Sequence, residues 1–303
     1  MPFAMRKSLI ALVSAAAVGA GALTITTGAE AAPVAIVPAI VPAAVPVHGA
    51  DPTDANLRQP LGDLAYSKVT VADSQTPGFG AATIYYPDDT TRGTYGGVAV
   101  VPGYTSPQSA VAWLGPRLAS RGFVVITIAT NSVYDQPTAR GRQLLSALDY
   151  LTASSPAAVR QRLDPNRLAV MGHSMGGGGA LHAVSQRTTI KAAVPLAPYN
   201  LDKTWQQVKT PTMLIGGSAD RVTTVAAHAR PFYRSMTGAR ERALVNVQGA
   251  DHGTFVRENA TIGKYTTAWL KRFVDEDTRY DQFLCPAPTG DGLAEYTASC
   301  PNI

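Results

Sequence analysis

The fold of this chain is decided by the stretch Arg167-Leu168-Ala169-Val170-Met171-Gly172-His173-Ser174-Met175-Gly176. Its apolar first half predicts a buried strand, and residues 177–186 predict a helix. A serine between two glycines at such a junction is typical of a tight strand-to-helix turn, because residues two positions before and after it must lack bulk. The turn exposes the Ser174 hydroxyl and points the Met175 N–H the same way. We therefore expect a nucleophile at Ser174, with a glycine-rich turn and a capping serine as the alternative.

Strand-like and helix-like segments alternate through the rest of the chain. Apolar residues at helical spacing predict helices around residues 111–118, 144–151 and 262–273. This alternation predicts an α/β fold of the α/β-hydrolase type, with a mostly parallel central sheet and helices on both faces. The expected strands are residues 83–86, 98–101, 123–129, 168–171, 192–196, 212–215 and 243–247.

The composition bounds the class of protein. With 303 residues, 46% of them hydrophobic and 16% charged, the chain can bury one large core and form one domain. Its formal net charge of +5 is spread thinly and forms no basic stripe, so we expect no nucleic-acid partner.

The N-terminus has the features of an export signal. Arg6 and Lys7 precede an apolar run, and Ala29-Glu30-Ala31 offers a cleavage site with small residues. We expect a signal peptide over residues 1–32, a Pro/Ala-rich leader over 33–55 and the folded domain over 56–303. The uncharged run is also long enough to be a membrane anchor, which is the alternative. The mature chain is expected to be extracellular, monomeric and free of the membrane.

The partners of Ser174 should follow it in the order acid, then histidine. His252 lies in a loop after the strand at 243–247, where it can take the serine proton; a surface histidine is the alternative. Asp220 lies after the strand at 212–215, where it can hold the imidazole tautomer. The other histidines are less well placed, and His228 is expected to lie within a helix; the remaining ones are His48, His173 and His182. Asp251 is expected to be solvated and Asp202 to cap a helix.

An oxyanion hole needs two N–H donors. Met175 supplies one, and Tyr104, in the segment Pro102-Gly103-Tyr104-Thr105 after the strand at 98–101, is our choice for the other. The Tyr104 ring could also line the cleft, although a buried core tyrosine is an alternative.

The two cysteines, Cys285 and Cys300, lie near the C-terminus. An even pair in an exported chain suggests a disulfide, with two free thiols as the alternative. A loop of this size would stabilise the fold by roughly 3 kcal/mol in the chain-entropy description.

Several motifs resemble one family, the actinobacterial cutinases, which include hydrolases of poly(ethylene terephthalate). The resemblance covers about residues 57–300. It implies a triad of Ser174, Asp220 and His252, an ester cleft lined by Tyr104, Met175, Tyr199 and Val222, and the Cys285–Cys300 disulfide. The motifs are Pro102-Gly103-Tyr104-Thr105, Ala112-Trp113-Leu114-Gly115-Pro116-Arg117-Leu118, Asp135-Gln136-Pro137, Arg140-Gly141-Arg142-Gln143, Met171-Gly172-His173-Ser174-Met175-Gly176-Gly177-Gly178-Gly179 and Trp269-Leu270-Lys271-Arg272-Phe273-Val274-Asp275-Glu276-Asp277-Thr278-Arg279-Tyr280.

The chain also departs from that family. Relatives usually carry Trp where this chain has Tyr199, so the aromatic platform is smaller, and the segment 251–255 beside His252 differs too. By resemblance, His228 and Phe232 should pack beneath Tyr199. Two carboxylate positions of calcium-stabilised relatives are Ser218 and Gln248 here, so we expect no metal. No cofactor is expected.

The strands at 192–196 and 212–215 are separated by too few residues for the lid that lipases often insert there. An open cleft suits short acyl chains and protruding segments of a polyester. The sequence therefore predicts a secreted serine esterase acting on cutin-like and synthetic polyesters and on short-chain esters. The alternatives are a lidless lipase or general carboxylesterase, a peptidase on the same fold, and a non-catalytic surface-binding protein.

Overall fold

The computed structural model of the chain describes residues 49–300. The expected signal peptide and the leader up to residue 48 lie outside these residues. Regular structure begins with helix α1 (Asp54–Arg58), whose first turn is capped by the Thr53 hydroxyl, which accepts from the Asn56 N–H at 3.2 Å. The first helix therefore starts inside the segment expected to be leader.

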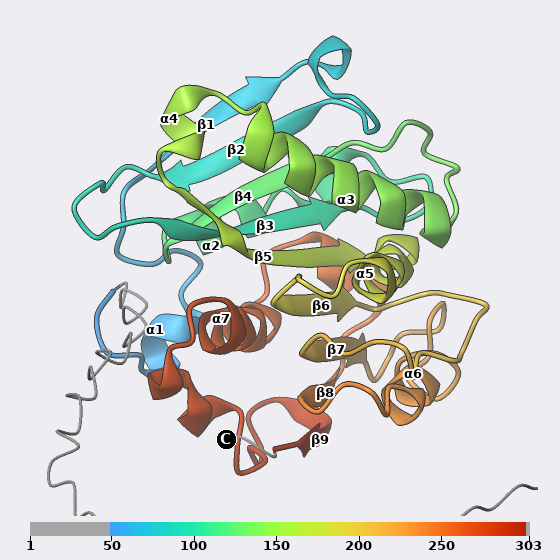
Figure 1. Cartoon of the computed structure of the whole chain (residues 1–303). Coiled ribbons are helices and arrows are strands. Elements are labelled where there is room, and N and C mark those ends of the chain that lie inside the picture. The colour runs from blue at the N-terminus through green and yellow to red at the C-terminus, as the bar shows by residue number, and fades with distance from the viewer. Residues whose placement is uncertain (1–48, 301–303) are drawn as a thin grey trace, which may run out of the picture. The chain divides into compact units, whose positions relative to one another are not determined.

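Nine strands form one sheet in the order β1-β2-β4-β3-β5-β6-β7-β8-β9 (Figure 1). The strands from β4 to β8 in that order are parallel, whereas β1, β2 and β9 pair antiparallel at the two edges. The mostly parallel sheet is therefore confirmed. The strands are β1 (Tyr66–Val71), β2 (Ala82–Pro87), β3 (Tyr95–Val101), β4 (Phe123–Ile128), β5 (Leu163–His173), β6 (Ala192–Leu196), β7 (Thr212–Gly217), β8 (Arg242–Val247) and β9 (Leu293–Ser299).

Helices cover both faces of the sheet, as expected (Figure 1). Helices α3, α5 and α6 pack on one face, and α2 and α7 pack on the other. The helices are α2 (Leu114–Ala119), α3 (Pro137–Ala153), α4 (Ala157–Arg160), α5 (Met175–Gln186), α6 (Ala229–Ser235) and α7 (Ala260–Val274).

Strand β3 shows why two helical layers are needed. Val98 and Val100 belong to the core under α2 and α7, while Ala99 and Val101 belong to the core under α3 and α5. All four side chains are fully buried. Successive strand residues point to opposite faces, so an uninterrupted apolar strand is stable only when both faces are covered.

The strand order changes direction at β3, because β4 lies on one side of it and β5 on the other. Open parallel sheets bind ligands at such a switch point, beyond the carboxyl ends of the strands. The loops after β3 and β5 meet there. Residues 197–211, which join β6 to β7, contain no helix or strand in the described structure, so no lid domain is inserted between these strands.

Some sequence expectations were wrong in detail. The edge strands β1 and β9 were missed because they are only half buried and lack the continuous apolar runs of the central strands. Asp202 caps no helix: its carboxylate accepts from the N–H and hydroxyl of Thr204 within a loop. His228 lies at the N-cap of α6 rather than inside the helix.

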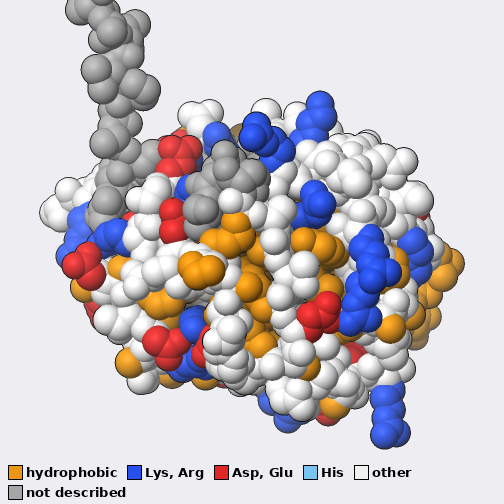
Figure 2. All heavy atoms as spheres, turned by 90° about the horizontal axis from the view of Figure 1, so that it is seen from below, with side chains coloured by type: hydrophobic (Ala, Val, Ile, Leu, Met, Phe, Trp, Pro, Cys, Tyr) orange, Lys and Arg blue, Asp and Glu red, His pale blue; other side chains and the backbone are white. Residues whose placement is uncertain are grey.

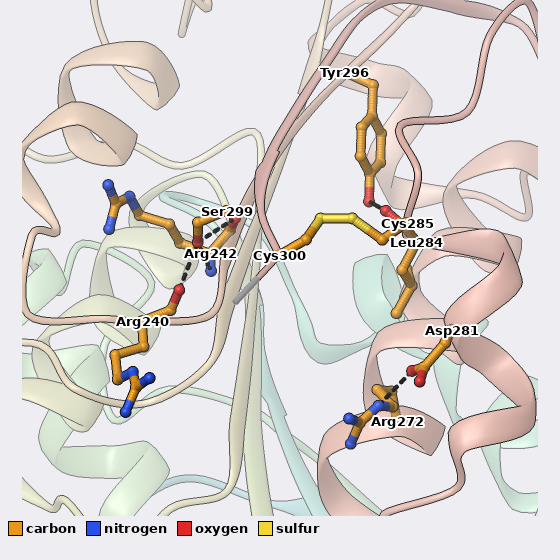
Figure 3. The surroundings of a disulfide bond; sticks show 9 residues. All are labelled: Arg240, Arg242, Arg272, Asp281, Leu284, Cys285, Tyr296, Ser299 and Cys300. Atoms are coloured by element: carbon orange, nitrogen blue, oxygen red, sulfur yellow. Dashed lines mark hydrogen bonds and ion pairs between the residues drawn. A yellow bond between two sulfur atoms is a disulfide. The ribbon is translucent and has the colours of Figure 1, made fainter. Parts of the chain in front are cut away.

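The disulfide suggested by the two cysteines is present between Cys285 and Cys300 (Figure 3). It joins the residue after β9 to the segment that follows the last 3-10 helix, with the two Cα atoms 6.5 Å apart. Beside it, the Tyr296 hydroxyl donates to the Leu284 carbonyl at 2.8 Å. The C-terminal edge of the sheet is thus fixed by one covalent and one hydrogen-bonded link.

Charge is distributed without a single basic stripe on the face shown in Figure 2, where Lys and Arg side chains form separate groups with acidic side chains among them. Within residues 49–300, no helix combines the length and hydropathy needed to cross a membrane.

Candidate active site

Ser174 occupies the turn between β5 and α5 in a backbone conformation that side chains rarely adopt, with φ 56° and ψ −119°. A Cβ atom at Gly172 would lie 2.3 Å from the Gly176 carbonyl oxygen, and one at Gly176 would lie 2.5 Å from the carbonyl oxygens of Val101 and Pro102. Both positions therefore require glycine, as the spacing indicates. Strained backbone of this kind persists at functional sites because the surrounding structure holds it.

His252 and Asp220 form a direct pair. His252 begins the 3-10 helix η3 (His252–Val256) after β8, and Asp220 follows β7. The imidazole Nδ1 donates to the Asp220 Oδ2 at 2.8 Å. The Asp220 side chain is fully buried, whereas that of His252 is 21% exposed. The acid is thus shielded while the ring reaches the surface.

Asp220 is surrounded by donors. The N–H groups of Val222 and Thr223 both donate to its Oδ1 at 2.8 Å, and the Thr223 hydroxyl lies 2.8 Å from its Oδ2. Burial alone would raise the pKa of Asp220, but the hydrogen bonds from His252 and Thr223 outweigh burial and lower the pKa to about 2. Asp220 is therefore ionised at neutral pH.

Sequence reasoning missed Thr223. Its signal was available in the spacing Asp-x-x-Thr, since an aspartate that ends a strand commonly accepts from backbone N–H groups two and three residues on. That pattern predicts the turn. It does not predict that the hydroxyl also reaches toward His252, a contact between residues 29 positions apart.

Backbone hydrogen bonds of Ser174 and a ring contact of His173 place the serine beside the Asp220–His252 pair. The Ser174 N–H donates to the Leu196 carbonyl at 2.9 Å, and the Tyr199 N–H donates to the Ser174 carbonyl at 2.8 Å. The preceding residue, His173, places its ring 4.6 Å from that of His252. The loops after β5, β6, β7 and β8 therefore converge on one point.

His173 itself is a poor candidate base. It is buried, with its ring stacked on Phe255 at 6.2 Å. Burial, reinforced by the neighbouring His252, lowers the pKa of His173 to about 3. The His173 ring is therefore neutral at physiological pH and packs against the site without acting as a base.

The two expected oxyanion donors flank Ser174. Met175 is the first residue of α5, so its N–H has no partner within the helix and lies at the positive end of the helix dipole. Gly103 is so close to Ser174 that a Cβ atom there would lie 2.9 Å from the serine Cβ. This contact places the loop carrying Tyr104 against the serine. Within residues 49–300, neither the Met175 N–H nor the Tyr104 N–H has an acceptor.

Apolar side chains gather around the mouth of the site. Within residues 49–300, six large apolar side chains are 39–80% exposed. Five of them lie in loops at the carboxyl ends of β3, β4, β6 and β7. We call this set the rim: it comprises Tyr104, Val133, Tyr134, Leu201 and Val222. The exposure of Tyr104 excludes the buried-core alternative, and its ring meets that of Tyr134 edge-on at 5.8 Å.

Arg140 on α3 holds two of the rim loops together. Its guanidinium is fully buried and donates to the carbonyls of Pro102, Val133 and Asp135 at 3.0, 2.8 and 2.8 Å. The backbones that carry Tyr104 and Tyr134 are therefore fixed relative to each other, although their rings are exposed. A planar guanidinium suits this task because it presents several donors in fixed directions.

Tyr199 is half buried and rests on a second aromatic layer. Its ring lies 5.1 Å from that of His228, which in turn meets Phe232 edge-on at 5.9 Å. The Lys203 ammonium donates to the His228 Nδ1 at 2.9 Å. Burial and, next, the Lys203 charge lower the pKa of His228 to about 4, so the supporting ring is neutral. This agrees with the packing that the resemblance implies.

The sheet order, the strained serine after β5 and the order serine, aspartate, histidine along the chain define an α/β-hydrolase. The comparisons with known proteins narrow this class. The family model PETase, described as PET hydrolase-like, matches residues 41–301, and the chain belongs to this family.

Named relatives cover most of the chain. Bis(hydroxyethyl) terephthalate hydrolase of Streptomyces coelicolor is 50% identical over 84% of this chain and 82% of its own length. Cutinase 2 of Thermobifida cellulosilytica is 52% identical over 84% of this chain and 97% of its own length. Cutinase cut1 of Thermobifida fusca is 52% identical over 84% of this chain and 80% of its own length.

Proposed function

We propose that this chain is a secreted serine esterase that hydrolyses ester bonds in polyesters and in short-chain acyl esters. The observation that carries the proposal is the buried, ionised Asp220 bonded to His252 beside the strained Ser174. The printed names of the relatives, cutinases and a terephthalate ester hydrolase, support the same chemistry.

In the first half-reaction, His252 accepts the Ser174 hydroxyl proton as Oγ bonds to the ester carbonyl carbon. The negative charge moves to the carbonyl oxygen, which accepts from the N–H groups of Met175 and Tyr104. As the ester C–O bond breaks, His252 returns the proton to the leaving alcohol, and an acyl-serine remains. Asp220 stabilises the imidazolium without taking its proton.

In the second half-reaction, water replaces the alcohol. His252 accepts a proton from the water as its oxygen attacks the acyl carbonyl, and returns it to Ser174 Oγ as the acyl-serine bond breaks. The carboxylic acid leaves, and the enzyme is restored. Neither half-reaction needs a cofactor or metal.

The rim supports a polymer as the substrate. Exposed apolar side chains that lie together commonly mark a binding surface, and those of the rim lie in loops at the same edge of the sheet as Ser174. Tyr199, Tyr104, Met175 and Val222 would contact the acyl group. An open edge without a lid suits a segment that protrudes from an insoluble polymer.

Export accounts for the N-terminus and the cysteines together. We propose a cleaved signal peptide over residues 1–32, a leader over 33–55 and a monomeric extracellular enzyme. A disulfide is stable in that compartment.

Product analysis after incubation with cutin and with a poly(ethylene terephthalate) film tests the proposal, alongside nitrophenyl esters of increasing acyl length. We expect soluble acids from the polymers and a preference for short acyl chains, with neither activity in S174A. A preference for long acyl chains would indicate a lipase, and activity on small esters alone a general carboxylesterase. A complete lack of hydrolysis would indicate a binding protein.

A further inference from the structure

Thr223 takes no part in the proposed proton transfers, although its side chain contacts both Asp220 and His252. Its side chain is almost fully buried between the loops after β6, β7 and β8. The hydroxyl oxygen lies 2.8 Å from Asp220 Oδ2, 3.1 Å from the Ala197 carbonyl oxygen and 3.3 Å from His252 Nδ1. One hydroxyl therefore contacts both the acid and the base, as well as the segment hydrogen-bonded to Ser174.

The directions of these bonds follow from the available protons. The His252 Nδ1 proton points to Asp220 Oδ2 at 2.8 Å, so this nitrogen is a donor. The Thr223 hydroxyl has one proton, and the carboxylate is both nearer and more strongly accepting than the Ala197 carbonyl. Its proton therefore goes to Asp220, and its lone pairs face the imidazole N–H as a second, weaker acceptor.

We infer that Thr223 is a positioning residue of the reaction, whose hydroxyl locks His252 against Asp220 and draws negative charge away from the carboxylate oxygen that faces the ring. The inference rests on the proposed function. Thr223 also donates its N–H to Asp220 Oδ1, so this one residue holds both carboxylate oxygens. The backbone bond survives any side-chain change, which isolates the hydroxyl for testing.

Removing the hydroxyl has two separable consequences. The imidazole loses a contact that fixes its plane, which lowers kcat. Asp220 Oδ2 loses a donor and carries more negative charge toward the ring, which stabilises the imidazolium and moves the acid limb of the rate profile to higher pH. The other titratable groups facing His252 are Asp220, His173 on β5 and His228 before α6, with Lys203 behind the last. The substitution leaves all of these groups in place and removes a hydrogen-bond donor from Asp220 alone.

The test compares T223V and T223S with wild type, using T224V as the matched control. Thr224 is exposed, and its hydroxyl accepts from the Ala227 N–H at 3.3 Å. For T223V we expect kcat on nitrophenyl butyrate to fall by about tenfold, KM to stay unchanged, and the midpoint of the acid limb to rise by about half a pH unit. T223S should restore both kcat and the midpoint, and T224V should match wild type.

The inference is overturned if T223V has the kcat and pH profile of T224V, if its acid limb moves to lower pH, or if T223S is as impaired as T223V. Melting curves identify a variant that folds poorly, and T223A then takes the place of T223V. These outcomes differ from a failure of the proposed function, in which wild type itself would release no nitrophenol.

Discussion

The acid side of the site and the rim around its mouth are held by different kinds of contact. On the acid side, the fully buried Asp220 carboxylate is fixed by donors from Val222, Thr223 and His252. At the rim, the Arg140 guanidinium fixes the backbones of the two loops that carry Tyr104 and Tyr134, and the side chains are exposed. The Asp220 side chain, which is proposed to take part in the reaction, is therefore held in place by hydrogen bonds. In the proposed function, substrate choice depends on exposed rim side chains, which a single substitution can replace without changing a buried contact.

The largest effect is expected at the acid. D220N keeps the size of the side chain, but its amide cannot hold the reactive imidazole tautomer, so kcat should fall by about 10⁴-fold with little change in KM. Initial rates on nitrophenyl butyrate, together with a melting curve, provide the measurement. A folded D220N protein within tenfold of wild type would remove Asp220 from the mechanism.

Replacing Arg140, which holds two rim loops together, should lower kcat less than D220N does and should also lower the stability of the fold. R140K replaces the planar guanidinium by a compact ammonium that cannot reach all three carbonyls in their directions, and each buried carbonyl left without a donor costs about 1–3 kcal/mol. We expect the melting temperature to fall by several degrees, since 1 kcal/mol corresponds to about 2–4 °C in a chain of this size. Displacement of the Tyr104 loop should lower kcat by about tenfold.

Arg142 provides the control for that change, because it is exposed on the same helix. R142K should melt and react like wild type. If R140K and R142K behave alike in both calorimetry and kinetics, the buried guanidinium does not organise the rim.

The pH dependence separates the base from its neighbours. His252 must be neutral to accept the serine proton, so kcat/KM should rise with pH within the range of about 5 to 8 and then level off. His173 and His228, with their pKa lowered by burial to about 3 and about 4, are neutral throughout this window and cannot cause the rise. A rate that is flat from pH 5 to 8 while chemistry is limiting would contradict the assignment of His252.

The sequence predicted the acid side better than the rim, for a physical reason. Ser174, Asp220 and His252 each follow a strongly apolar strand, so the topology of a parallel sheet brings them to one edge. The rim depends on how far a side chain extends from a loop, and spacing left open whether Tyr104 was exposed or buried. The contacts of Thr223 with Ala197 and His252 cross between loops, and no local pattern predicts them.

The same reasoning applies to the sheet. Its central strands have uninterrupted apolar runs because both faces are covered, and the sequence identified them. Strands β1 and β9 alternate between half-buried and exposed residues at the edges, where pairing with a neighbour rather than hydropathy determines the conformation.

The smallest effect is expected at Tyr199. An aromatic acyl group stacked on a ring gains about 0.5–1.5 kcal/mol beyond burial, and indole offers a larger face than phenol. Y199W should therefore raise turnover of aromatic polyesters by a few-fold, provided that the ring of His228 beneath it accepts the indole. The measurement is the ratio of terephthalate release to nitrophenyl butyrate hydrolysis. An unchanged or lower ratio in a variant that melts like wild type would mean that Tyr199 does not support the acyl group.

Covalent labelling tests most directly whether Ser174 is a nucleophile activated by His252 and Asp220. The protein is incubated with a fluorophosphonate, digested and mapped by mass spectrometry, in parallel with S174A and D220N. We expect one adduct on the peptide that contains Ser174, much slower labelling in D220N and none in S174A. An adduct on another residue, or labelling that persists in S174A, would contradict the assignment.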